Sequence, residues 1–412
     1  MFYGWKLATV GSFGNLLLQG SVFYAMNAFI EPLVELHGWS RAGIGLSMGF
    51  ASIMMTLSMP VGILLTNRVS IRTLMTSGAF IGGLSYIGLG HVRELWLFGL
   101  LLAVVWVCGQ ICGGVVATML MNRWFAVYRG RAFGLVNMGS SLSGAFLPLF
   151  ALILIDTLGV AWAYALLGGL AFMLFPVCWT VVRDTPAEIG LSVDGMPRDR
   201  SVPARRESGA VVPIGWRSLV STRRMWIIGV SFGLGLFALG GVLSQLKPRF
   251  ADSGMDSYVA MGFMCLTALF GAVGKYAWGW VCDRTTPLFA AKVLFLCNAL
   301  SLSCIFLPLS VFNVVLFVMA YGVCMGGLWT VFPAVVAYVY GKRQFPHVYK
   351  YISMFVAVKA LGYAAIGLSH SATGSYDTAY AAMIGLLLVA FAATATLKER
   401  EAVECTRFSP CN

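Results

Sequence analysis

The chain has 412 residues, of which 59% are hydrophobic and 11% are charged, and its formal net charge is +12. So few charged side chains exclude an ordinary soluble globule, in which about a quarter of the residues are charged. The composition instead predicts an all-α membrane protein that crosses the bilayer many times.

Hydrophobic stretches long enough to cross a membrane occur along the whole chain. A bilayer core of about 30 Å takes roughly 20 helical residues. The charge-free run 293–341 has room for two helices with a turn near 308–313. Two stretches, 257–282 and 351–376, are interrupted only by Lys275 and Lys359. With the eight remaining charge-free stretches, we predict twelve transmembrane helices; these eight are 7–30, 42–67, 73–92, 95–122, 132–155, 157–182, 225–246 and 378–397.

The lysine and arginine residues predict the orientation of these helices, because positive residues are retained on the cytoplasmic side of short loops. With both termini in the cytoplasm, 22 of the 28 lysines and arginines lie inside and two lie within the membrane. The remaining four lie outside and are Arg41, Arg93, Lys247 and Arg249. We therefore predict a multi-pass protein of the cell (inner) membrane with cytoplasmic N- and C-termini. The positive charge is a topology signal and gives no reason to invoke nucleic acid.

One long hydrophilic stretch divides the predicted helices six and six. We predict an N-terminal six-helix bundle over 1–182, a cytoplasmic linker over 183–224, a C-terminal six-helix bundle over 225–397 and a cytoplasmic tail over 398–412. Inside the linker, Thr185 to Glu188 has the form of a capping box with proline in the first turn, which predicts a short helix.

A short internal repeat supports the division into two pseudo-symmetric halves. The segment from Gly279 to Arg284 follows the eighth predicted helix, and the segment from Gly62 to Arg68 follows the second. Aligning Asp283 with Asn67 also carries the first helix onto the seventh. Parallel repeats of this size are expected in a transporter whose halves rock around a central site.

Lys275 and Lys359 are the most informative residues, because no acidic residue in their membrane segments can neutralise them. A charged side chain at the centre of a membrane helix costs roughly 2.5 to 3.5 kcal/mol, and it usually faces a cavity, a partner or a permeation path. We interpret the missing partner as an anion that arrives from outside. Residues three and four positions away are mostly small around Lys275 and include aromatic rings around Lys359.

These two segments resemble the major facilitator superfamily, in which a Gly-x-x-x-Asp-Arg loop recurs after the second and eighth helices, and the resemblance covers essentially the whole chain. Within that superfamily, several segments resemble the oxalate:formate antiporter family and its monocarboxylate-transporter relatives. They are 2–6 at the start, 122–130 between the fourth and fifth helices, 188–195 in the linker and 326–333 in the tenth helix. The resemblance implies a twelve-helix fold and transport of small carboxylates.

The resemblance also implies binding residues. Oxalate antiporters are similar in having a cationic residue in the eighth helix, usually an arginine, and its position corresponds to Lys275. They also have a lysine in the eleventh helix, and its position corresponds to Lys359. Aromatic residues of that family correspond to Trp329 and Tyr24. Three positions depart from the pattern and put the identity of the carboxylate in question: Gly114, Met325 and Asn67.

From these observations we expect a secondary active transporter of mono- or dicarboxylates, working as an anion exchanger by alternating access. Asp283, Arg284 and Arg68 are expected to latch helix ends on the cytoplasmic side. We expect a monomer in the lipid bilayer with no cofactor and no metal site. An enzyme is disfavoured because the chain has no HExxH, GxSxG or clustered Cys and His.

Proton-coupled monocarboxylate symport is the alternative. Such symporters are similar to this chain but have an aspartate four residues before the basic residue of the eighth helix, where this chain has Gly271. Symport stays open because Lys275 or the substrate carboxylate can itself accept the proton. An anion channel is a further alternative, which ion flux far above carrier turnover would reveal.

Overall fold

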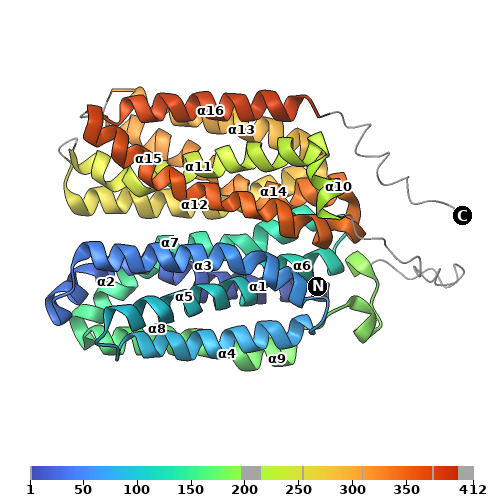
Figure 1. Cartoon of the computed structure of the whole chain (residues 1–412), viewed down its shortest axis with the longest axis horizontal. Coiled ribbons are helices and arrows are strands. Elements are labelled where there is room, and N and C mark those ends of the chain that lie inside the picture. The colour runs from blue at the N-terminus through green and yellow to red at the C-terminus, as the bar shows by residue number, and fades with distance from the viewer. Residues whose placement is uncertain (1, 196–214, 253–254, 309, 374, 398–412) are drawn as a thin grey trace, which may run out of the picture.

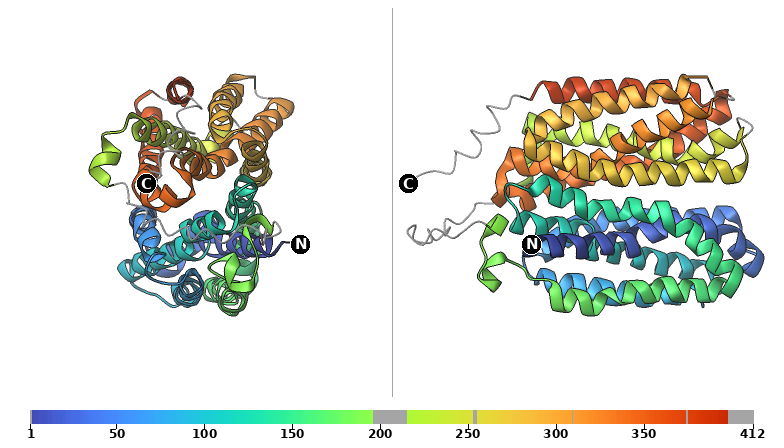
Figure 2. Two further views of the ribbon diagram at one scale, coloured as in Figure 1. Left: turned by 90° about the vertical axis from the view of Figure 1, so that its right-hand side faces the viewer. Right: turned by 180° about the vertical axis from the view of Figure 1, so that it is seen from behind.

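The computed structural model describes residues 2–195, 215–252, 255–308, 310–373 and 375–397. In these ranges every regular element is a helix, and long helices lie roughly parallel in two bundles side by side (Figure 1). The prediction of an all-α fold with two six-helix bundles is confirmed. The further views in Figure 2 show the same separation of the N-terminal and C-terminal helices.

The N-terminal bundle contains six passes, three of which are interrupted helices. The first pass joins α1, η1 and α2, the fourth joins α5 and α6, and the sixth joins α8 and α9. The elements are α1 (Tyr3–Gly14), the π-helix η1 (Asn15–Gly20), α2 (Ser21–His37), α3 (Arg41–Leu65), α4 (Ile71–Leu89), α5 (Leu95–Cys112), α6 (Val115–Trp124), α7 (Arg129–Leu158), α8 (Val160–Phe172) and α9 (Leu174–Val181).

The C-terminal bundle follows three short helices of the linker, η2 (Pro186–Ile189), η3 (Val193–Gly195) and α10 (Trp216–Val220). Its elements are α11 (Arg223–Asp252), α12 (Ser257–Arg284), α13 (Pro287–Ser303), η4 (Cys304–Phe306), α14 (Val311–Ile352), η5 (Ser353–Ala357), α15 (Val358–Thr373) and α16 (Asp377–Ala395). The turn predicted near 308–313 is confirmed, because η4 ends at Phe306 and α14 begins at Val311.

Helix α14 contains two passes. Gly341 has a φ of 77°, which breaks the helix between the tenth pass and the eleventh, and the eleventh continues through η5 and α15. A left-handed φ favours glycine because it has no Cβ. Nine described helical stretches are long and apolar enough to cross a membrane, and one of them, Val311–Gly362, holds both of these passes.

Local signals in the sequence explain several helix ends. The Ser40 hydroxyl accepts a hydrogen bond from the Gly43 N–H at 3.0 Å, and Thr286 and Ser310 cap α13 and α14 in the same way. Such caps satisfy N–H groups that have no partner within the helix. The capping box predicted in the linker is confirmed, since Glu188 accepts a hydrogen bond from the Thr185 N–H at 3.1 Å.

The two bundles meet most closely where α7 crosses α12. A methyl group added to Gly130 would overlap the carbonyl oxygen of Gly279, and one added to Gly134 would overlap that of Lys275. Small residues let membrane helices approach with their backbones nearly in contact. The crossing therefore places the backbone of Lys275 directly against the first bundle.

Candidate functional site

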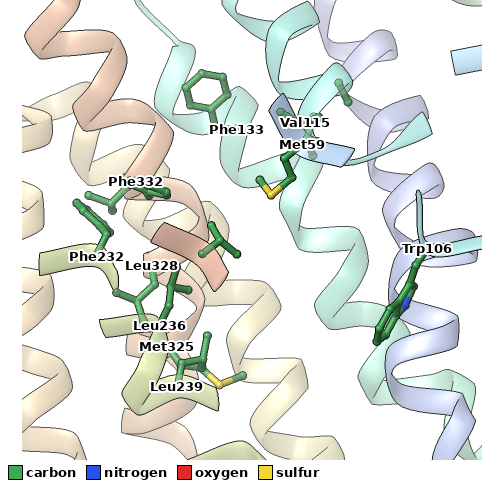
Figure 3. Packing of buried hydrophobic residues seen from close by; sticks show 14 of the residues in the cluster. Met59, Trp106, Val115, Phe133, Phe232, Leu236, Leu239, Met325, Leu328 and Phe332 are labelled. Atoms are coloured by element: carbon green, nitrogen blue, oxygen red, sulfur yellow. The ribbon is translucent and has the colours of Figure 1, made fainter. Parts of the chain in front are cut away.

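The four residues predicted to bind substrate line one cavity between the two bundles. The cavity has a volume of about 30 Å³ and is bordered by helices of both bundles. Figure 3 shows two of its apolar lining residues, Leu239 and Met325, next to each other on the second bundle. The full lining is Phe23, Tyr24, Ser141, Leu239, Leu243, Lys275, Met325, Gly326, Trp329 and Lys359.

Lys275 reaches from α12 to the first bundle. Lys275 is only 4% exposed. Its ammonium donates hydrogen bonds to the carbonyl oxygen of Asn137 at 2.9 Å and to the hydroxyl of Ser140 at 2.7 Å. Both acceptors lie on α7 and both are uncharged. An ammonium has three donors, so these two bonds leave one N–H of Lys275 for a ligand in the cavity that it lines.

Lys359 enters the cavity from α15. Its ammonium lies 4.4 Å from the ring centre of Phe23 on α2 and 5.5 Å from that of Trp329 on α14. Cations within about 6 Å of an aromatic face are attracted by the negative charge of the π-system. The two rings therefore hold the second cation between the bundles, as Asn137 and Ser140 hold the first.

The two predicted aromatic residues occupy different places in the wall. The Tyr24 ring packs edge-on against Phe23 at 4.9 Å between centres and also faces Gly144 of α7. Trp329 contributes its ring beside Lys359, and its carbonyl oxygen accepts a hydrogen bond from the Asn137 side chain at 3.4 Å. Asn137 therefore contacts the second bundle through both its backbone and its amide.

The chemistry of the lining suits a small anion. Two side chains are cationic and the lining contains no carboxylate within the described ranges. A water molecule needs roughly 10 to 15 Å³ of such space, so 30 Å³ holds about two waters or a ligand of a few heavy atoms. Aliphatic and aromatic side chains exclude water from the remaining wall, which strengthens the attraction between a lysine and an anion.

The contributions of α7 and of Phe23 to the site were not predicted from the sequence. Ser140 binds the Lys275 ammonium and Ser141 lines the cavity, and both belong to the polar run Gly139–Ser140–Ser141 inside a membrane helix. Polar residues in a membrane segment usually face protein or a cavity. That run was the available signal, although it could not show which helix it faces.

The residues predicted as a latch have different surroundings. The carboxylate of Asp283, at the end of α12, accepts hydrogen bonds from the Gly130 N–H at 2.6 Å and from the Arg131 N–H and Nε at 3.0 and 3.1 Å. Arg284 is exposed and lies over the ring of Trp280, 5.4 Å from its centre. Arg68 is exposed in the turn that follows α3. Asp283 thus joins the two bundles at the end of the molecule that carries the linker, which is called here the linker side. A latch role stays a prediction for Asp283, Arg284 and Arg68.

A second contact closes the linker side. The Asn122 amide donates to the Lys342 carbonyl oxygen at 3.2 Å, and the Lys342 ammonium donates to the Arg123 carbonyl oxygen at 3.1 Å. Lys342 directly follows Gly341, where the chain turns between two passes. The start of the eleventh pass is therefore tied to the end of α6 in the other bundle.

The first half of the repeat has Asn67 where the second half has Asp283. In the N-terminal bundle, acidic residues of the linker cap the helix ends. Asp184 accepts hydrogen bonds from Ser70 and from the N–H groups of Ile71 and Arg72 at 2.8 to 3.0 Å. The Asp194 carboxylate accepts hydrogen bonds from the N–H groups of residues 126–128, directly before α7. A carboxylate at a helix N-terminus also interacts favourably with the helix dipole.

Twelve helical passes with a small cationic cavity between two bundles define the architecture of a membrane transporter. The profile of the Major Facilitator Superfamily matches residues 11–358. The chain belongs to the Major Facilitator Superfamily.

Curated relatives and solved structures agree with this family. The chain is 25% identical to monocarboxylate transporter 11 of Mus musculus over 298 residues, which is 71% of this chain and 62% of that protein. It is 25% identical to the membrane sensor protein UhpC of Salmonella typhimurium over 282 residues, or 66% of this chain and 63% of that protein. The chain thus spans a little under two thirds of the length of these relatives.

The fold is also similar to that of solved transporters. The structure of the human organic anion transporter MFSD10 matches with a TM-score of 0.69 and 16% identity, covering 94% of this chain and 99% of that one. The E. coli fucose:proton symporter FucP matches with a TM-score of 0.66 and 15% identity, covering 95% and 98%. At such low identity these matches support the fold alone.

Proposed function

We propose that this protein is a secondary active transporter that exchanges small organic anions, mono- or dicarboxylates, by alternating access. One observation supports the proposal above all others: Lys275 and Lys359 come from different helices and line the same small cavity. A monocarboxylate balances one ammonium and a dicarboxylate balances both. Similarity to a monocarboxylate transporter is consistent with this substrate class.

Exchange follows from the energetics of closing the cavity. Removing two cations from water costs roughly 5 to 7 kcal/mol on membrane insertion scales. Water in an open cavity lowers this cost, and an anion lowers it when the cavity closes and water leaves. The loaded carrier therefore changes its orientation more readily than the empty one, so that influx of one anion accompanies efflux of another.

Proton-coupled symport remains the second candidate for the same site. The position four residues before Lys275 is Gly271, which packs close to Met325 and Ser141. The described cavity lining therefore provides no carboxylate as a proton carrier, which favours exchange. In proteoliposomes, uptake driven by an imposed pH gradient without an internal anion would favour symport over our proposal.

The binding site can be tested with a thermal-shift screen of the purified protein. The anions are formate, lactate, oxalate, malonate and succinate, and each is measured on the wild type, on Lys359→Ala and on Lys6→Ala. Lys6 is an exposed lysine at the linker side and serves as the matched control. We expect at least one carboxylate to raise the melting temperature of the wild type and of Lys6→Ala but not of Lys359→Ala. Equal stabilisation of all three proteins would contradict the site.

A further inference from the structure

The hydrogen bonds of Lys275 connect the cavity to the packing of the two bundles. Its ammonium binds the Ser140 hydroxyl and the Asn137 carbonyl oxygen, and these acceptors lie one turn apart on α7. Ser140 and Lys275 belong to different bundles, so this contact lasts only while α7 and α12 stay together at this level. A group that takes the ammonium away from α7 weakens the contact between the bundles.

The contact also lies between the cavity and the linker-side closure. Along α7, the glycines at 130 and 134 pack against α12 nearer the linker side, and Asn137 and Ser140 follow toward the cavity. Asp283 binds the beginning of α7 at Gly130. Gly130 lies about 10 Å along the helix from Asn137, because the seven positions between them rise 1.5 Å each. Lys275 is therefore a residue of this interface that a ligand in the cavity can reach.

We propose that Ser140 is a positioning residue whose hydroxyl, together with the Asn137 carbonyl, competes with a substrate carboxylate for the Lys275 ammonium. A substrate carboxylate displaces the hydroxyl, and loss of that bond releases α12 from α7 on the linker side. The inference rests on the proposed function, because it assigns a coupling role to one residue of that site. It explains how binding in the cavity is transmitted to the closure about 10 Å away.

Two substitutions have opposite consequences. Ser140→Ala removes the competing acceptor, so Lys275 becomes more available and anions bind more tightly. Ser140→Asp places a permanent carboxylate beside the ammonium, so external anions bind more weakly. Because the new carboxylate belongs to α7, it also holds Lys275 more firmly against the first bundle, so this variant opens the linker side less readily.

The first experiment needs no anion. Cys282 is 4% exposed and lies at the crossing of α7 and α12, where the Cys282 Cβ would be 2.9 Å from a methyl group added to Gly130. Its rate of modification by N-ethylmaleimide, measured by peptide mass spectrometry, therefore reports opening of the linker side. We expect Ser140→Ala to raise this rate about tenfold, the effect of losing a hydrogen bond to a charged group. An unchanged rate would overturn the proposal.

The matched control is Ser143→Ala. Ser143 is on the same helix and fully buried, and its hydroxyl has no hydrogen-bond partner in the part of the chain that the structure describes. We expect the rate at Cys282 in this variant to equal that of the wild type. A comparable rise in Ser143→Ala would show that any lost hydroxyl on α7 loosens the crossing, and the specific role of Ser140 would be wrong.

The second experiment uses malonate and formate as probes. We expect Ser140→Ala to bind them about tenfold more tightly than the wild type, which a damaged or misfolded site would not do. In proteoliposomes loaded with radiolabelled malonate, Ser140→Asp should release label into buffer that contains malonate more slowly than the wild type does. Weaker binding by Ser140→Ala, or exchange by Ser140→Asp as fast as that of the wild type, would refute the proposal.

The two experiments separate the inference from the proposed function. If neither probe binds the wild type while Ser140→Ala still accelerates modification of Cys282, the substrate class is wrong and the contact between Ser140 and Lys275 still holds the bundles together. If both probes bind the wild type and Ser140→Ala equally, the substrate class stands and the role of Ser140 is wrong.

Discussion

Replacement of Asp283 by asparagine should open the linker side of the protein. The carboxylate accepts three hydrogen bonds from Gly130 and Arg131 at 2.6 to 3.1 Å, and its side chain is 5% exposed. Asparagine has a single acceptor oxygen and no charge, so at least one donor loses its partner. The remaining bonds also become weaker because they are no longer charge-assisted.

The size of the effect follows from these contacts. Hydrogen bonds to a charged group contribute about 1.5 to 3 kcal/mol and neutral ones about 0.5 to 1.5 kcal/mol. A negative charge near the N-terminus of α7 adds about 0.3 to 1 kcal/mol. We therefore expect Asp283→Asn to shift the balance between closed and open linker side by roughly 2 to 4 kcal/mol, which is about 30- to 700-fold.

The assay is modification of Cys282 by N-ethylmaleimide in anion-free detergent solution. Asp156→Asn is the matched control, because Asp156 is exposed near the other end of α7. Cys178 is fully buried inside the first bundle and reports unfolding of that bundle. We expect Cys282 to react faster in Asp283→Asn alone, while Cys178 stays unreactive. Equal rates at Cys282 in Asp283→Asn and wild type would refute the latch.

Three further substitutions test the site and the interface. Lys275→Arg should still bind carboxylates but discriminate more sharply between oxalate and formate in thermal shifts, because guanidinium is planar and binds a carboxylate through two N–H groups at once. Complete loss of binding would contradict a site that needs only a positive charge at this position. Trp329→Leu removes a ring beside Lys359 and should weaken anion binding about 2- to 30-fold, and an unchanged affinity would exclude that contribution. Gly279→Val should accelerate modification of Cys282, because its side chain overlaps the Gly130 carbonyl, whereas Gly262→Val on the same helix meets no atom within 4 Å and should not.

Much of the architecture follows from local features of the sequence. The number of passes, the turn before Val311 and the capping box of the linker depend on properties of single segments, such as hydrophobic length and turn chemistry. The two membrane lysines could be found in the same way, since the cost of a charge in the bilayer does not depend on which helix lies beside it. Their presence alone predicted that they face a cavity, and both line one.

The partners of these charges could not be predicted from the sequence. Arg131, rather than the neighbouring Arg284, pairs with Asp283, and Ser140 binds a lysine 135 residues away. The linker acid Asp184 caps a helix more than a hundred residues before it.

The sequence by itself therefore determined the helices, the two halves and the two cations, because each is specified by a short stretch of chain in contact with lipid or water. Only the tertiary structure decided which helix faces each cation, since this depends on the rotation and crossing of helices. Here the glycines of α7 and α12 set that crossing, because they allow two backbones to touch and bring Ser140 within 2.7 Å of the Lys275 ammonium.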